Sequence, residues 1–302
     1  MSHPFFSIVI PTYNRADFLP GTLDSVLQQT FSDYEIIIID DSSTDNTKET
    51  LKSYLQKYAH VKYFWQQNQE RGAARNFGMQ QSDGEYFIFF DSDDVMLLDY
   101  LEILFSKILQ LNKPNFIATK YELQRNKKRF PSSLKKLKEG WYDIEVLLQG
   151  NPFACNFCVK KRNPSIQLFE ERREYTTMED WMFLIQNIHN DKIYLIDKIT
   201  ILLNDHPARS MQKDHSKVIS ARQLATQWII EKNILNKNQK KKLWSYSFYF
   251  CAIHSYLDNK RKTALSYLLY SLKYNISIYK FLTLFLKILI GRKNIQRLKT
   301  TE

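Results

Sequence analysis

The sequence predicts an α/β protein in which a mostly parallel sheet is covered by helices on both faces. Two runs, residues 6–11 (FSIVIP) and 34–40 (YEIIIID), are almost entirely apolar, which is typical of strands buried on both faces. Residues 16–30 between them place apolar side chains at helical spacing. Strands and helices that alternate in this way indicate a doubly wound domain.

The same alternation continues to about residue 119. The predicted elements are a helix at 45–59, a strand at 61–65, a helix at 72–81, a strand at 86–91, a helix at 97–111 and a strand at 115–119. The basic stretch 120–138, which contains Pro131, is expected to be a loop or a solvated β-excursion. The next region mixes elements, with a helix near 178–190 and a strand near 192–203. Four helices follow, at about 216–231, 239–257, 260–274 and 277–290.

The composition is that of an ordinary globular protein. The chain has 302 residues, of which 44% are hydrophobic and 25% charged. Its three cysteines are too few for a disulfide framework. Cys155 and Cys158 have the C-x-x-C spacing, but a zinc site needs a second ligand pair and none is near them in the sequence. We expect them to be small buried residues.

The N-terminus is expected to be native structure. The opening MSHPFFSIVIP lacks the basic segment and the small-residue cleavage site of a signal peptide. The sequence also has no run of 18 apolar residues, so no membrane-spanning helix is expected. These features favour a cytoplasmic protein with reduced thiols.

The positive charge is concentrated in the C-terminal quarter. Residues 231–302 hold 15 Lys and Arg against 3 Asp and Glu, whereas the rest of the chain has a net charge of −1. This segment suits an anionic surface as partner. Residues 281–290 have only Thr283 and Lys287 as polar positions, the composition of an interfacial helix on anionic lipid. The alternative is a helical subdomain that packs on the rest of the protein. No nucleic acid is expected, because no nucleic-acid-binding motif accompanies the charge.

Acidic residues follow the strand that ends near residue 91. Ligands of parallel sheets bind at the carboxyl ends of the strands. Asp91 and Asp93 place two carboxylates at such an end, where their oxygen atoms can hold a Mn²⁺ or Mg²⁺ ion that also binds a diphosphate. The alternative is a polar turn in which Asp94 caps the next helix.

A second acidic group, DDSSTD at 40–45, follows the strand 34–40. A carboxylate here can accept the N3–H of a uracil ring, or the whole group can be a capping turn. Arg71, Arg75 and Asn76 open a helix on the same edge of the sheet. An arginine there can meet a phosphate or brace a carboxylate, with an ordinary surface position as the alternative.

Four segments occur in one order and with one spacing: SIVIPTYNR at 7–15, IIIIDDSSTDNT at 36–47, NQERGAARNFGM at 68–79 and DGEYFIFFDSDD at 83–94. Together they resemble glycosyltransferase family 2, whose nucleotide-binding domain has the Rossmann-like GT-A fold. The resemblance covers residues 5–119 closely and extends with weaker motifs to about residue 212. It implies a nucleotide-sugar half at 1–120, an acceptor-side half at 121–215 and a basic helical extension at 216–302.

The resemblance assigns donor and metal roles to residues of these segments. Asp41 would bond the uracil edge, Asp91 would face the ribose and the metal, and Asp93 would be the main metal ligand. The other residues assigned to the nucleotide-sugar site are Pro11, Thr12, Tyr13, Asn68, Arg75 and Ser92. The family often has a glycine in the DDSSTD element, where this sequence has Ser42 and Ser43.

Two weaker motifs follow. Glu179 and Asp180 begin a helix and look like the family's catalytic element, so we assign Asp180 as the base and Glu179 as the second candidate. The alternative is a pair of acidic residues that favour the helix dipole. His206 is expected to complete the metal site or to bond the diphosphate together with Arg209 and Ser210. The alternative is an ordinary loop histidine.

The sequence therefore predicts an inverting, metal-dependent hexosyl- or N-acetylhexosaminyltransferase. Its expected donor is a nucleotide sugar, most simply a UDP-sugar, and its acceptor a glycan or lipid-linked oligosaccharide of bacterial cell-surface polysaccharide synthesis. We expect a cytoplasmic enzyme, peripheral on the inner face of the membrane. The alternatives are a nucleotidyltransferase and a non-catalytic binding protein with the GT-A fold. The PTYNRAD segment is not the Gly-rich basic loop of the former, and the intact Asp91, Asp93 and Asp180 argue against the latter.

Overall fold

The computed structural model describes residues 3–206 and 214–292 and divides into two compact units. Of these residues, the first unit contains 3–143, Pro152–Arg173 and Asn190–His206. The second contains Ile144–Asn151, Glu174–His189 and 214–292. The predicted division at 1–120, 121–215 and 216–302 stays a prediction.

The first unit is built on one mixed sheet. Its strands are β1 (Phe6–Thr12), β2 (Tyr34–Asp40), β3 (Val61–Trp65), β4 (Tyr86–Phe89), β5 (Val95–Met96), β6 (Phe116–Arg125), β7 (Lys128–Pro131), β8 (Gly140–Tyr142), β9 (Cys158–Lys160) and β10 (Ile193–Asn204). The sheet order is β3-β2-β1-β4-β9-β6-β10-β5, with β7 paired to β6 and β8 to β10. Strands β3, β2, β1 and β4 are parallel, as are β6 and β10, and β9 is antiparallel to both its neighbours. The predicted α/β class is confirmed.

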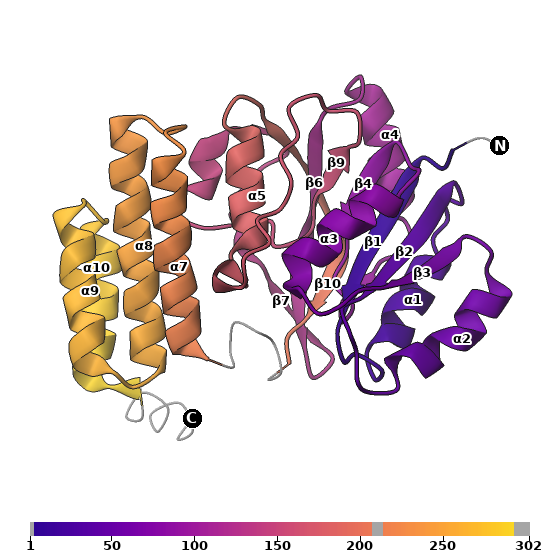
Figure 1. Cartoon of the computed structure of the whole chain (residues 1–302). Coiled ribbons are helices and arrows are strands. Elements are labelled where there is room, and N and C mark those ends of the chain that lie inside the picture. Colours follow the sequence, from indigo (N-terminus) through magenta and orange to yellow (C-terminus); the bar gives the residue numbers. More distant parts are fainter. Residues whose placement is uncertain (1–2, 207–213, 293–302) are drawn as a thin grey trace. The chain divides into compact units, whose positions relative to one another are not determined.

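Four helices complete the first unit: α1 (Leu19–Leu27), α2 (Thr47–Lys57), α3 (Glu70–Gln81) and α4 (Tyr100–Gln110). Helix α3 packs on β1 and β2 (Figure 1). Gly78 makes the close approach possible, because a Cβ atom at this position would lie 2.3 Å from Val9 Cγ1. All residues of β2 are buried, as a strand covered on both faces requires.

Some boundaries differ from the prediction for local reasons. Of the two structures expected for residues 120–138, the protein has the β-excursion. Strand β6 continues to Arg125, and the chain then turns back and pairs with it as the antiparallel strand β7. Asn126 and Lys127 between them have φ of 47° and 63°, the positive values that a two-residue hairpin turn requires. The helix expected from residue 97 begins at Tyr100, because Val95 and Met96 pair with β10.

The second unit is helical. It contains α5 (Glu179–Ile188), α7 (His215–Glu231), α8 (Lys237–Leu257), α9 (Arg261–Lys273) and α10 (Ile278–Ile290), the last four running side by side (Figure 1). The predicted helical C-terminal region is thus confirmed. The connections between these four helices contain Asn233, Asn259 and Asn275, whose φ values of 54°, 57° and 70° end a helix in the left-handed region. In the described part of the chain, no helix is long and apolar enough to cross a membrane.

Candidate active site

Three carboxylates gather in the turn that follows β4. Oxygen atoms of Asp91, Asp93 and Asp94 lie within 4.8 Å of one another. Asp94 is buried, and its Oδ1 accepts a hydrogen bond from the backbone N–H of Asn204 at 2.9 Å. It therefore fixes this turn to the end of β10, in contrast to the alternative in which it would cap α4. Ser92 between the other two is also buried.

Arg75 braces the first of these carboxylates. Its Nη2 lies 3.0 Å from Asp91 Oδ1, and its side chain is almost completely buried in α3. The guanidinium lies 5.5 Å from the centre of the Phe169 ring. A buried arginine held by an aromatic ring presents its donors in a fixed direction. Of the two roles considered for Arg75, the structure thus has it brace a carboxylate.

Asp93 has two neighbours of basic character. His206 Nε2 lies 2.9 Å from Asp93 Oδ2, and Arg15 Nη2 lies 3.5 Å from the same oxygen. The His206 ring stacks on Phe18 at 4.6 Å between centres. Sequence reasoning singled out neither Arg15 nor Phe18. The available signal was their position directly after β1, at the same edge of the sheet as Asp93.

Asp41 accepts four hydrogen bonds. Its donors are the side-chain amides of Gln66 and Asn68 and the backbone N–H groups of Gln69 and Glu70, at 2.7 to 3.0 Å. Because a carboxylate offers about four lone-pair positions, these donors saturate it. The last two belong to the start of α3, so Asp41 caps this helix from another strand. A bond from Asp41 to a uracil ring stays a prediction, and it requires one of the four donors to give way.

The end of β1 offers surface for a ligand. Tyr13 leaves 48% of its surface exposed, and Thr12 is buried with an Oγ1 that has no hydrogen-bond partner among the described residues. Asn14 ties this end to the next acidic turn, because its Oδ1 accepts the backbone N–H of Thr44 at 2.7 Å. Pro11, in β1 itself, is half-buried.

The Glu179–Asp180 pair lies in the second unit, at the first turn of α5. Glu179 is buried, whereas Asp180 is half-buried. Asp180 Oδ1 accepts the backbone N–H of Trp181 at 2.7 Å, and its Oδ2 accepts Asn151 Nδ2 at 3.0 Å. Sequence reasoning did not find Asn151, because it lies 29 residues before its partner. The greater access to Asp180 agrees with its choice as the base.

The structure thus brings some of the predicted residues together. Within the first unit, Asp91, Asp93, Arg75 and His206 form one connected group, and Asn68 joins Asp41 in a second. Arg209 and Ser210 lie outside the described residues. Cys155 and Cys158 are buried, as expected, and Cys251 is buried as well.

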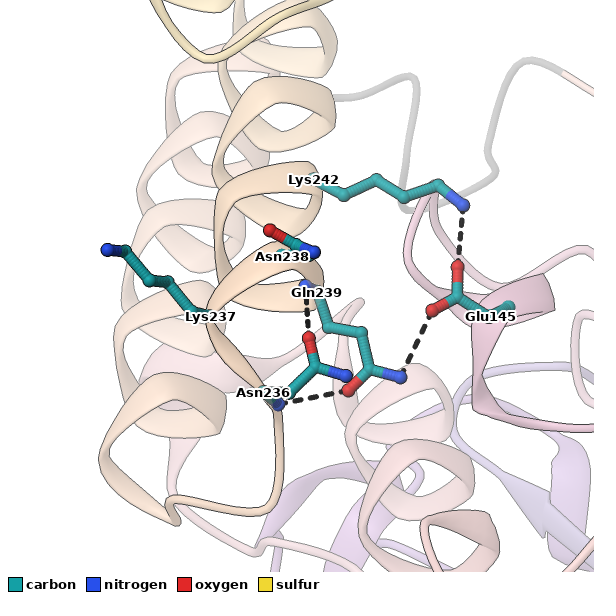
Figure 2. A pocket seen from close by; sticks show the side chains of 6 residues that line it. All are labelled: Glu145, Asn236, Lys237, Asn238, Gln239 and Lys242. Atoms are coloured by element: carbon teal, nitrogen blue, oxygen red, sulfur yellow. Dashed lines mark hydrogen bonds and ion pairs between the residues drawn. The ribbon is translucent and has the colours of Figure 1, made fainter.

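In the second unit, a hollow of about 550 Å³ lies beside the start of α8 (Figure 2). Glu145 accepts hydrogen bonds there from Gln239 Nε2 at 3.0 Å and from Lys242 Nζ at 2.6 Å. These contacts anchor the segment Ile144–Asn151 to α8 within the second unit. None of the residues that line the hollow was singled out by the sequence.

The comparisons with known proteins agree on one family. A family model described as Glycosyl transferase family 2 matches residues 7–162. An uncharacterized glycosyltransferase of Haemophilus influenzae is 29% identical over 255 residues, which cover 83% of this chain and 89% of that protein. The chain spans only 16–23% of the length of several other curated glycosyltransferases that it matches.

Solved structures share the fold. S. aureus TarS 1–349 in complex with UDP-GlcNAc has a TM-score of 0.69 and 20% identity, covering 88% of this chain and 81% of that one. The mannosyltransferase PcManGT of Pyrobaculum calidifontis, in complex with GDP-Man and Mn²⁺, has a TM-score of 0.61 and 14% identity, covering 100% and 84%. Because the family model matches more than half of the chain, the protein belongs to glycosyltransferase family 2 and has the GT-A fold.

Proposed function

We propose that the protein is an inverting, metal-dependent glycosyltransferase that takes a sugar from a UDP-sugar. The observation that carries the proposal is the group of carboxylates after β4, which the buried Arg75 braces at 3.0 Å. It lies at the carboxyl end of a parallel strand, where α/β sheets bind their ligands. The UDP-GlcNAc complex of TarS, a structural neighbour, supports uracil as the nucleobase of the donor. The GDP-Man complex of PcManGT is the reason to test a guanine nucleotide as well.

The residues after β4 fit a Mn²⁺ or Mg²⁺ ion. Carboxylate oxygens suit both ions, and Asp91 and Asp93 leave 31% and 16% of their side chains exposed, whereas Asp94 is buried and engaged. We assign Asp91 and Asp93 as ligands and His206 as a third, since its buried Nδ1 has no hydrogen-bond partner among the described residues. A bound ion would neutralise the charge that develops on the departing diphosphate.

The proposed donor site continues to the ends of β1 and β2. The exposed ring of Tyr13 offers a surface on which the nucleobase can stack. Thr12 Oγ1, which has no hydrogen-bond partner among the described residues, offers a hydrogen-bonding group. Asn68, Arg75 and Ser92 stay assigned to this site, as do Pro11 and Asp41. The diphosphate is assigned to Arg209 and Ser210.

Asp180 is the proposed general base. Its carboxylate takes the proton from an acceptor hydroxyl as that oxygen attacks the anomeric carbon and the bond from that carbon to the diphosphate oxygen breaks. Hydrogen bonds from Asn151 Nδ2 and from the backbone N–H of Trp181 hold this carboxylate in place. With water as acceptor, the same step releases UDP and free sugar, which makes the proposal measurable while the acceptor is unknown.

The surface of α9 and α10 supports a peripheral membrane role and a lipid-linked acceptor. On α10 one stripe packs inward, with Leu284 and Ile288 buried against Leu268 and Ala252. The opposite stripe leaves large apolar side chains exposed: Ile278, Tyr279, Leu282, Leu286, Leu289 and Ile290, together with Leu269, Tyr270 and Leu272 of α9. This apolar stripe lies within the segment of net charge +12, so an anionic lipid surface suits it. Helix α10 therefore packs on α8 and α9 with one face and exposes apolar side chains on the opposite face.

The decisive experiment is a donor screen with Mn²⁺. We would measure thermal stabilisation by UDP-glucose, UDP-GlcNAc, UDP-galactose and GDP-mannose, and then UDP or GDP release. At a hundredfold excess over the dissociation constant, a true donor adds about 2.7 kcal/mol to the free energy of unfolding. Stabilisation by GDP-mannose alone would overturn the UDP assignment. Pyrophosphate release from a nucleoside triphosphate and a sugar phosphate would favour the nucleotidyltransferase alternative.

A further inference from the structure

Arg222 of α7 is a fully buried cation in the second unit. Its guanidinium carbon lies 3.6 Å from the centre of the Trp181 ring and 5.1 Å from that of Phe250. Its Nε donates to Ser247 Oγ at 3.1 Å and its Nη2 to the carbonyl oxygen of Gln149 at 3.4 Å. The guanidinium therefore contacts two aromatic rings, and its hydrogen bonds go to neutral oxygens.

This arrangement is costly for the fold. No carboxylate among the described residues forms an ion pair with Arg222. Burial lowers the pKa of its guanidinium to about 9, so it stays charged at neutral pH. A buried charge without an opposite charge lowers stability unless its neighbours compensate, and cation–π contacts compensate only in part. Because a buried, unpaired cation lowers stability, packing alone does not explain an arginine at this position.

The contacts of Arg222 lead to two groups that donate hydrogen bonds to Asp180. Trp181, on which the guanidinium stacks, donates its backbone N–H to Asp180 Oδ1. Gln149, which accepts from the guanidinium, lies two residues before Asn151, whose side-chain amide donates to Asp180 Oδ2.

The segment that carries these residues is held at further points. Trp181 Nε1 donates to the carbonyl oxygen of Leu147 at 2.7 Å, which ties α5 to the segment Ile144–Asn151. Glu145 ties the same segment to α8 (Figure 2). Arg222 of α7 thus contacts both α5, through Trp181, and the segment Ile144–Asn151, through Gln149.

We propose that Arg222 is a positioning residue for the catalytic base: its guanidinium, between Trp181 and the Gln149 carbonyl, sets the direction of the Asp180 carboxylate. The inference rests on the proposed function, because it gives Asp180 the role of base. A planar, charged group is suited to this task, since it can stack on a ring and bond a carbonyl in one plane. The ammonium group of a lysine is not planar and cannot stack on the ring in this way.

The test is a kinetic comparison of full-length variants by UDP release from UDP-GlcNAc with Mn²⁺. Arg222→Met keeps much of the side-chain volume but removes the stack and both hydrogen bonds. We expect kcat to fall at least about tenfold while the KM for UDP-GlcNAc changes less than twofold, because donor binding does not involve Asp180. Trp181→Phe changes the other partner of the same stack and should also lower kcat. If Arg222→Met fails to fold, Trp181→Phe tests the same inference.

A double-mutant cycle separates positioning from general stability. If Arg222 acts through Asp180, adding Arg222→Met or Trp181→Phe to Asp180→Asn should cause little further loss of kcat. Losses that multiply instead would overturn the inference. Leu268→Ala, in the core of α8 to α10, is the matched control: it should lower the melting temperature and leave kcat per folded molecule unchanged.

The two possible failures can be told apart. If the wild-type protein releases no nucleotide from any donor, the proposed function fails. If the wild type is active and folded Arg222→Met and Trp181→Phe keep its kcat, only the role of Arg222 fails.

Discussion

Removal of the Asp93 carboxylate should abolish metal binding and leave the fold intact. This carboxylate is partly exposed and contacts His206 and Arg15. We expect Asp93→Ala to lower kcat/KM by on the order of 100-fold or more, the scale at which the removal of one electrostatic stabiliser acts. Isothermal titration of UDP with and without Mn²⁺ should show that the metal-dependent part of the affinity is lost. Unchanged turnover in EDTA would contradict metal dependence.

A control for Asp93 is available on the same sheet. Asp83 lies in the turn before β4, has an exposed side chain and pairs with Lys62. Asp83→Ala removes an equal charge at the opposite end of β4 from the proposed metal ligands and should leave both kcat and the Mn²⁺ effect unchanged.

Asp180 and Glu179 can be distinguished by near-isosteric changes. Asp180→Asn keeps the size but cannot take a proton, so we expect UDP release to fall by about 10²-fold or more while UDP binding is retained. Glu179→Gln changes a buried side chain and should act more through stability than through kcat. A larger kcat loss for Glu179→Gln than for Asp180→Asn would reverse the assignment.

Candidate residues could be predicted from the sequence where they belong to short motifs, and their contacts could not. The Asp91–Asp93 turn and the Glu179–Asp180 pair stand next to predicted elements. Arg15, which contacts Asp93, and Asn151, which contacts Asp180, come from segments whose distance from their partners only the fold determines. The saturation of Asp41 likewise depends on where the turn at 66–70 lies.

The apolar stripe of α9 and α10 is the element on which the membrane prediction depends. Removing residues 276–302 would also uncover Leu268, which packs against Leu284 and Ile288, so substitutions on the exposed face are a cleaner test. We expect Leu282→Ser, Leu286→Ser and Leu289→Ser together to reduce sedimentation with vesicles of phosphatidylglycerol and phosphatidylcholine severalfold. The nucleotide affinity should not change.

Leu109→Ser in α4 is the control for this test, because it removes an exposed leucine from the first unit. Equal vesicle binding by wild type and triple variant at low salt would remove the role of the stripe. If the wild type instead self-associates without lipid and the triple variant does not, the stripe is a protein interface.

The elements themselves were largely predictable, because apolar periodicity and turn residues act locally. The four C-terminal helices begin and end within a few residues of their predicted limits, and asparagines in the left-handed region end three of them. The antiparallel strand β9 was not predicted. It has three residues, Cys158–Lys160, too few to show a period, and it exists because β4 and β6 each leave it an edge to pair with.

The acid stability of the whole molecule should depend on His254. Burial, then His215 and Arg222 beside it, lower its pKa from 6.5 to about 4. The unfolded chain therefore binds more protons than the folded one between pH 6.5 and 4, and stability falls as the pH falls through this window. The shift corresponds to roughly 3 kcal/mol at pH 4 relative to pH 7.

Urea unfolding at pH 7 and pH 4.5 measures this contribution. His254→Gln cannot titrate, so its loss of stability between the two pH values should be clearly smaller than that of the wild type. The carboxylates contribute equally to both proteins and cancel in the difference. Equal losses would mean that His254 does not supply the effect.

The cap that Asp41 provides for α3 has a consequence for the order in which the chain folds. The start of α3 has no side-chain cap of its own, and the helix contains two glycines, which weaken an isolated helix. Its first turn gains its hydrogen-bond acceptor only when the end of β2 is in place. Helix α3, and with it the Arg75 brace, should therefore consolidate after the pairing of β1 and β2, late on the folding pathway. The Arg75 side of the proposed donor site would then be completed by a non-local contact and not by a preformed helix.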